Sequence, residues 1–318
     1  MTVPVIVDCD PGHDDVMALW FAAGHPALEL LAVTTVGGNV PLEHTSRNAR
    51  VALAVAGVAG VPVAAGAPGP LVRELSTAEW IHGENGLGGP ELPDPEDPDA
   101  VAAPVRLDAR SATELIADTL AAASEPVAII ATGPITNVAV FLRDRPELAD
   151  RVREIVWMGG STERGNVTPY AEFNAWVDPE ALDLVLRSGV RFTMVGLNVT
   201  HRALLTSRVR ERLAAVGNRT AAFGDELLEF FCRTNDEVFG MPDGPLHDPV
   251  AVAVLADPDA VEVVHTRLDV ELVGTETVGA TSVDLDGMLA REPNAHVAVG
   301  LDVERFWAGV ELAYGRLA

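Results

Sequence analysis

The stretch VPVIVDCDPGHDDVMALWFAA, residues 3–23, decides the expected fold. Residues 3–8 form an apolar, β-branched run that is typical of a buried strand, and residues 14–23 show a helical pattern. Pro11 and Gly12 lie between them and predict a turn. The stretch therefore predicts a strand, a tight turn and a helix, with acidic residues gathered where the strand meets the helix.

The same alternation of short apolar runs and longer helical patterns continues along the chain. Further strands are expected at 28–36, 126–132, 153–159 and 190–196, and further helices at 45–57, 137–144 and 179–189. Nearly continuous apolar strands separated by helices are typical of a parallel sheet that is covered on both faces. We therefore predict an α/β fold of three layers, in which an open, mostly parallel sheet carries helices on both faces.

The rest of the chain is less regular. Residues 266–274 and 281–287 are expected to form two antiparallel strands, and residues 303–317 a closing helix. Residues 83–104 are rich in Gly, Pro and acidic residues, which predicts a long surface loop, either a lid or a disordered excursion. We find no internal repeat or break in composition, so residues 1–318 are expected to form a single domain.

The charged residues exclude several classes of function. The chain carries 47 acidic and 22 basic residues, a net charge of −25, and every basic residue is Arg because the sequence contains no Lys. A Walker P-loop and a Schiff-base enzyme both need a Lys, so neither is expected. The strong negative charge argues against nucleic acids and anionic membranes as partners. A neutral small molecule or a metal cation is the more natural ligand.

Two further observations concern location. No stretch reaches the roughly 20 apolar residues that a membrane span requires, and the sequence begins with a predicted strand rather than a basic leader. Cys9 and Cys232 are too few for a disulfide framework and lack the spacing of a metal or redox pair. We therefore expect a cytoplasmic protein with buried thiols.

Polar residues follow the predicted strands, at the edge where parallel sheets bind ligands. The first strand is followed by Asp10, Asp14 and Asp15, and it contains Asp8. The dipole of the following helix favours Asp14 and Asp15, but ionised groups at the end of an apolar strand are costly unless they are paired or bound to a metal. A hard cation with oxygen ligands removes this cost, and Ca²⁺ is favoured over Mg²⁺. Residues after the other strands include Asn39, Thr132 and Met158.

These motifs resemble those of the inosine-uridine-preferring nucleoside hydrolases. VDCDPGHDDVMAL (7–19) is similar to the N-terminal motif of that family, and HDPVAV (247–252) to its C-terminal motif. Between them, similar motifs occur in the family's order at 37–39, 81–89, 131–137, 158–160, 172–181 and 197–201. The resemblance covers nearly the whole chain and implies a nucleoside hydrolase fold with a Rossmann-like core.

The resemblance also implies roles for individual residues. It implies a Ca²⁺ ion held by Asp10, Asp15, the carbonyl of Thr132 and Asp248. The substrate would be a ribonucleoside. Its 2′ and 3′ hydroxyls are expected to contact Asp14, Asn39 and Asn174, and its 5′ hydroxyl Asn166 and Glu172. His82 and His247 are expected near the nucleobase, and Met158 at a neighbouring strand end. Relatives form dimers and tetramers, so a homo-oligomer is expected.

Hydrolysis of an N-glycosidic bond needs an activated water, stabilisation of an oxocarbenium-like ribosyl cation, and help for the departing base. A metal-held water that gives its proton to Asp10 would meet the first need. The surrounding carboxylates would meet the second. His247 is the candidate for the third, because it directly precedes Asp248.

Three questions stay open at the level of sequence. Relatives carry tyrosines near the base in the helix before HDPVAV, whereas residues 229–239, EFFCRTNDEVF, contain none, so the preferred base is not predicted. Residues 225–240, like 83–104, could act as a lid. The alternatives to hydrolysis are a Ca²⁺-dependent nucleoside or sugar sensor without turnover and a haloacid dehalogenase-type phosphatase, which would want the Lys that this chain lacks.

Overall fold

A computed structural model describes residues 2–318 and contains a nine-stranded sheet in the order β3-β2-β1-β4-β5-β6-β9-β7-β8. All neighbouring strands from β3 to β9 pair in parallel, and β7 pairs antiparallel with both β9 and β8. The predicted α/β fold with a mostly parallel sheet is confirmed. The strands are β1 (Val3–Cys9), β2 (Leu28–Thr35), β3 (Val63–Ala65), β4 (Val127–Ala131), β5 (Val152–Met158), β6 (Phe192–Val195), β7 (Val261–Val270), β8 (Thr281–Asp284) and β9 (Ala295–Leu301).

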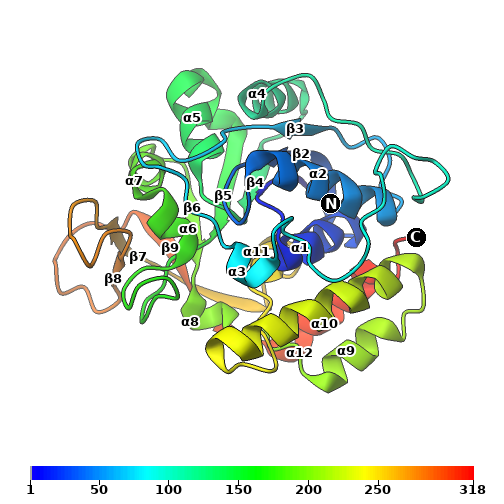
Figure 1. Ribbon diagram of the computed structural model, residues 1–318. Coiled ribbons are helices and arrows are strands. Elements are labelled where there is room, and N and C mark those ends of the chain that lie inside the picture. Colours follow the sequence, from blue (N-terminus) through cyan, green and yellow to red (C-terminus); the bar gives the residue numbers. More distant parts are fainter. Residues whose placement is uncertain (1) are drawn as a thin grey trace.

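Helices cover both faces of this sheet (Figure 1). One face packs against α4 (Ala112–Ala122), α5 (Thr136–Asp144) and α7 (Pro179–Arg187). The other packs against α1 (His13–Gly24), α2 (Leu42–Val55), α11 (Asp248–Ala256) and α12 (Val303–Tyr314), with α9 (Ser207–Ala214) and α10 (Arg219–Phe239) outside them. The remaining short helices are α3 (Glu79–His82), α6 (Phe173–Val177), α8 (Leu197–Thr200) and a 3₁₀ turn at Pro146–Arg151.

The central strand β1 shows why both faces are covered. Val5 and Val7 point into one apolar core and Ile6 into the other, because successive side chains of a strand alternate between faces. All three side chains are fully buried. A strand that is apolar on both sides is stable only where helices exclude water from both faces, as they do here.

The sequence located most strands and several helices, but it missed two strands and the helices α4, α9 and α11. β3 is only three residues long, which is too short for a clear pattern. β9 (AHVAVGL) pairs in parallel with β6 and antiparallel with β7. The strand expected at 190–196 is therefore not the last parallel strand of the sheet. β7 and β8 do pair antiparallel, with Arg267 opposite Asp284, and α12 is the predicted closing helix.

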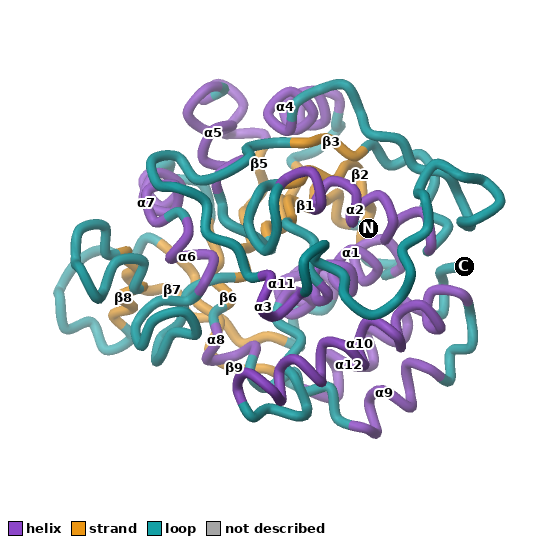
Figure 2. Tube along the Cα trace, viewed as in Figure 1, coloured by secondary structure: helices purple, strands orange, loops and turns teal. Residues whose placement is uncertain are grey.

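The predicted long loop lies against α2. Residues 83–104 contain no helix or strand, and Figure 2 shows this part of the chain as loop. The backbone amides of Ala102 and Ala103 donate to the carbonyl of Ala54 at the end of α2, and Arg50 on α2 pairs with Glu96 at 3.0 Å. Its role as a lid stays a prediction. Within residues 2–318, no helix has the length and apolar character needed to cross a membrane.

Candidate active site

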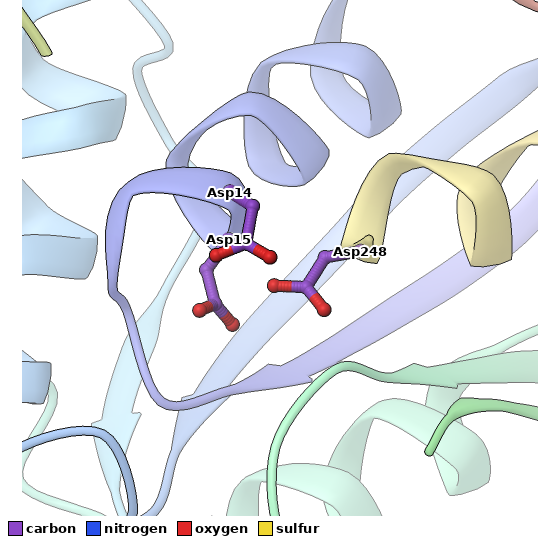
Figure 3. A group of neighbouring side chains, drawn as sticks. All are labelled: Asp14, Asp15 and Asp248. Carbon is purple, nitrogen blue, oxygen red and sulfur yellow. The ribbon is translucent and has the colours of Figure 1, made fainter. Parts of the chain in front are cut away.

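The carboxyl ends of β1, β2, β4, β5 and β6 meet at one edge of the sheet, and the acidic motif lies there. α1 begins directly after β1, so Asp14 and Asp15 occupy its first turn. Asp248 begins α11, more than 230 positions later in the chain and its carboxylate points toward those of Asp14 and Asp15 (Figure 3). One oxygen from each of the three lies within 4.8 Å of the others, and all three residues are buried.

Hydrogen bonds hold Asp15 and the neighbouring Asp10 in place. Asp15 accepts hydrogen bonds from the backbone amide of Gly12 at 3.0 Å and from the Thr132 hydroxyl at 2.7 Å. Asp10 Oδ2 accepts from the backbone amide of Asn39 at 2.7 Å, and the Asn39 side chain donates to the Asp10 carbonyl. Asp10 Oδ1, in contrast, is buried without a partner. Such an atom is costly unless a ligand contacts it.

Two glycines leave the space that Asp10 occupies. A Cβ atom on Gly38, after β2, would collide with Asp10 Oδ2, and a Cβ on Gly133, after β4, would collide with Asp10 Oδ1. The close-approach glycines that follow these two strands therefore fix the position of the carboxylate. No other side chain fits at either position without moving Asp10.

Burial raises the pKa of every carboxyl in the group, and repulsion between the carboxylates raises most of them further. Burial is the larger cause for Asp10, Asp14, Asp15 and Asp248, and the neighbouring carboxylates add to it for Asp10, Asp14 and Asp248. The pKa of Asp14 rises to about 7. Within the part of the chain described, none of these groups forms an ion pair with an Arg. A divalent cation would satisfy this uncompensated acidity.

Amide and carboxylate groups continue from the acidic group along one wall. The Asn174 side-chain amide donates to the carbonyls of Thr132 at 2.8 Å and Met158 at 3.0 Å. Glu172 caps α6, because its carboxylate accepts from the backbone amides of Asn174, Ala175 and Gly160. Burial raises the pKa of Glu172 to about 7 despite these bonds. Asn166 accepts a hydrogen bond from the amide of Phe173.

These groups line one cavity that is open to solvent, in which a few polar groups converge as they do in small-molecule sites. The predicted residues that line it are Asp14, Asn39, His82, Thr132, Met158, Asn166, Glu172, Asn174, His247 and Asp248. Asp10 and Asp15 are fully buried below it. The structure thus gathers all the sequence-predicted site residues in one place.

One part of the cavity wall is mainly apolar. Phe231 and Asn235 of α10 line the cavity, and Trp80 of α3 meets Phe239 of α10 edge to face, with ring centroids 5.7 Å apart. The sequence did not single out the other apolar lining residues, which are Ala78, Ile81, Val167 and Phe173, together with Trp80 and Phe239. Apolar residues carry no chemical motif, so only their position next to His82 or Asn174 could have indicated them.

The two predicted histidines both line this cavity. His247 lies at the N-terminus of α11, and its Nδ1 contacts the Thr200 hydroxyl at 2.7 Å. Burial lowers the pKa of His247 to about 3. His82 belongs to a buried group in which its Nδ1 lies 3.1 Å from Nδ1 of His13. His13 also stacks on Phe230, which places Phe230 behind the wall rather than on it.

Asp8 has side-chain partners on one carboxylate oxygen, whereas its Oδ2 is buried without a partner. Its Oδ1 accepts hydrogen bonds from the Thr34 hydroxyl at 2.6 Å and from the Asn137 amide at 2.7 Å. Asn137 also donates to the Thr35 carbonyl, so it joins β1, β2 and α5. Two side chains brought from β2 and α5 therefore bind this carboxylate, although burial still raises its pKa to about 6.

Comparison with known proteins agrees with this arrangement. A family model described as inosine-uridine preferring nucleoside hydrolase matches residues 5–308. The pyrimidine-specific ribonucleoside hydrolase RihA of Salmonella paratyphi A is 44% identical over 307 residues, which cover 96% of each chain. The inosine-uridine preferring nucleoside hydrolase of Leishmania major is 42% identical over 315 residues, which cover 98% of each chain.

Solved structures show the same similarity. The purine-preferring ribonucleoside hydrolase from Gardnerella vaginalis has a TM-score of 0.88 at 32% identity, with 98% of each chain covered. An inosine-guanosine nucleoside hydrolase has a TM-score of 0.87 at 29% identity. Fold and comparisons together define a ribonucleoside hydrolase. The chain belongs to the inosine-uridine preferring nucleoside hydrolase family.

Proposed function

We propose that the protein hydrolyses the N-glycosidic bond of ribonucleosides in a Ca²⁺-dependent reaction and releases the free base and ribose. The observation that carries this proposal is the group of buried carboxylates Asp14, Asp15 and Asp248, within 4.8 Å of one another and without a basic partner among the residues described. A phosphate ester would bring further negative charge to this group, whereas an uncharged nucleoside would not.

The residues present fit a bound Ca²⁺ ion. Asp10 Oδ1 is a buried carboxylate oxygen without a partner, and Asp15 and Asp248 add further oxygen donors of the kind that Ca²⁺ prefers. The Thr132 carbonyl accepts one hydrogen bond, from Asn174, and keeps a second lone pair for a ligand. Asp10, Asp15, Thr132 and Asp248 would therefore hold the ion. When bound, it would lower the pKa of a water molecule and attract the ribose hydroxyls.

The protein's own groups would perform the remaining steps. The attacking water forms a bond to C1′ of the ribose and gives a proton to Asp10, while the electron pair of the C1′–N bond leaves with the base. Asp14, Asn39 and Asn174 would hold the 2′ and 3′ hydroxyls, and Asn166 and Glu172 the 5′ hydroxyl. The fixed carboxylates favour the positive charge that develops on the ribosyl ring, because their position costs no reorganisation during the reaction.

The departing base would lie against the apolar wall. Phe231 offers a ring face for it, His247 would assist its departure, and His82 lies near the same end of the cavity. The relatives named above differ in base preference, from pyrimidine-specific to purine-preferring. Uridine is common to the pyrimidine-specific and inosine-uridine preferring relatives, so we propose it as the first substrate to test.

A panel of uridine, cytidine, inosine and adenosine, incubated with the protein and Ca²⁺ and assayed for free ribose, tests the proposal. Ribose released from at least one nucleoside supports hydrolysis. Binding of a nucleoside without release of ribose from any member would favour the alternative, a Ca²⁺-dependent sensor. We also propose that the protein is a homo-oligomer, a dimer or a tetramer, and light scattering after size-exclusion chromatography measures this directly.

A further inference from the structure

The contact between Thr200 and His247 defines a positioning residue for the departing base. Thr200 ends α8, is fully buried, and places its hydroxyl 2.7 Å from Nδ1 of His247. Nearby backbone bonds hold the two segments together: the amide of Leu246 donates to the carbonyl of Ala203, and the amide of Leu205 to the carbonyl of Gly244. The two side chains are thus held in place by antiparallel pairing between the segment that follows α8 and the segment that precedes α11.

The hydroxyl group has one hydrogen and needs an acceptor for it. Among the hydrogen bonds of residues 2–318, the Thr200 hydroxyl takes part in one, with Nδ1 of His247. A hydroxyl hydrogen buried without an acceptor is costly, which favours the hydroxyl as the donor to Nδ1. A nitrogen that accepts a hydrogen bond carries no proton. In that arrangement, the proton of the imidazole lies on Nε2.

We infer that Thr200 fixes His247 as the neutral tautomer with its proton on Nε2, so that an N–H donor faces the departing base. Nδ1 is occupied by Thr200, and His247 lines the cavity, which leaves Nε2 as the nitrogen available to a ligand. As the C1′–N bond breaks, its electron pair moves to the base, and the negative charge that develops there accepts the Nε2–H hydrogen bond. The proton stays on Nε2, and the released base takes its proton from solvent water.

This inference rests on the proposed role of His247, and its test separates the two. Nitrogen-15 NMR of the imidazoles in the intact protein with Ca²⁺ reads the tautomer, and the His247→Gln variant assigns the signal. We expect a protonated Nε2 and an unprotonated Nδ1 in the wild type. In Thr200→Val, which removes the hydroxyl at nearly constant volume, the Nδ1–H form should appear. A wild-type His247 protonated at Nδ1 would overturn the inference, as would a tautomer unchanged in Thr200→Val.

Kinetics then measure the consequence. In Thr200→Val, kcat/KM for uridine should fall by about tenfold or more, because a positioned donor to the leaving group contributes at least this much. A 4-nitrophenyl riboside releases a stable anion that needs no donor, so its rate should stay within roughly threefold. Thr200→Ser should restore the rate on uridine. Thr45→Val removes another buried hydroxyl, one that donates to the Leu42 carbonyl on α2, and should change neither rate.

The outcomes distinguish the two claims. Equal losses on both substrates in Thr200→Val would mean a merely structural role and would overturn the inference. If His247→Gln also leaves the ratio of the two rates unchanged, the proposed role of His247 itself fails, while the NMR result still decides the tautomer. If His247→Gln lowers the ratio and Thr200→Val does not, the inference on Thr200 fails alone.

Discussion

Replacing Asp10 by Asn should abolish most of the activity and at the same time stabilise the metal-free protein. Asp10 is fully buried, one of its oxygens has no partner, and burial raises its pKa well above the ordinary value. A neutral amide keeps the hydrogen bond from the Asn39 amide and removes the buried charge. We expect the free energy of unfolding without metal to rise by about 1–3 kcal/mol, because the substitution removes a desolvated charge that neighbouring carboxylates repel.

Activity should change in the opposite direction. An amide cannot accept the proton of the attacking water, and loss of a general base alone lowers kcat by about 10²- to 10⁴-fold. Thermal unfolding in EDTA should show Tm raised by ~2 °C for each kcal/mol, and the assay for free ribose should show the loss of turnover. Because Asp10 is also a proposed ligand, Ca²⁺ should raise the Tm of the variant less than that of the wild type.

Asp8→Asn is the matched control, since Asp8 is also buried, lies in β1 two residues before Asp10, and has both hydrogen bonds, from Thr34 and Asn137, on one oxygen that an amide can supply. This variant should retain activity within about tenfold, because Asp8 contacts no predicted substrate group. Near-normal turnover in Asp10→Asn would refute the assignment of the base. A metal-free Asp10→Asn protein that unfolds at a much lower temperature than the wild type would refute the reasoning about buried charge.

Two further predictions follow from the same site. Gly133→Ala should lower both the free energy of unfolding, by about 1–3 kcal/mol, and kcat, because the added Cβ collides with Asp10. Chemical denaturation measures the first effect and the ribose assay the second. An unchanged kcat would contradict the close approach of Gly133 to Asp10. For Glu172, burial raises the pKa to about 7 from an ordinary 4.5, so the folded state holds a proton that the unfolded state releases between these values. The free energy of unfolding of the wild type should therefore fall relative to Glu172→Gln as pH rises from about 4.5 to 7, and a difference that does not change over this range would contradict the shifted pKa.

Local chemistry and long-range assembly differ in how well the sequence predicts them. The acidic motif between β1 and α1 was predictable because strand, turn and helix signals lie within 21 residues, from 3 to 23. The strand ends identified Asn39, Thr132 and Met158 because parallel strands bring their carboxyl ends to one edge. Asp248 has no such local signal, and only the resemblance to a known family connected it to a group more than 230 residues earlier.

What the sequence missed depends on tertiary packing. A cation was expected to compensate Asp8, but Thr34 and Asn137 reach it from β2 and α5, and no local pattern indicates those partners. Likewise, Trp80 and Phe239 face the cavity only because α3 and α10 meet there. An apolar residue has the same appearance in the sequence whether it faces a core or a ligand, so the wall on the base side was not predictable.

The most direct test of the central claim is the rate of ribose release from uridine as a function of free Ca²⁺, after metal removal verified by elemental analysis. If Asp10, Asp15, Thr132 and Asp248 form one cation site that the reaction requires, the metal-free protein should be inactive. Activity should then return along a single-site saturation curve as Ca²⁺ is added. Full activity in the verified metal-free protein would contradict the account.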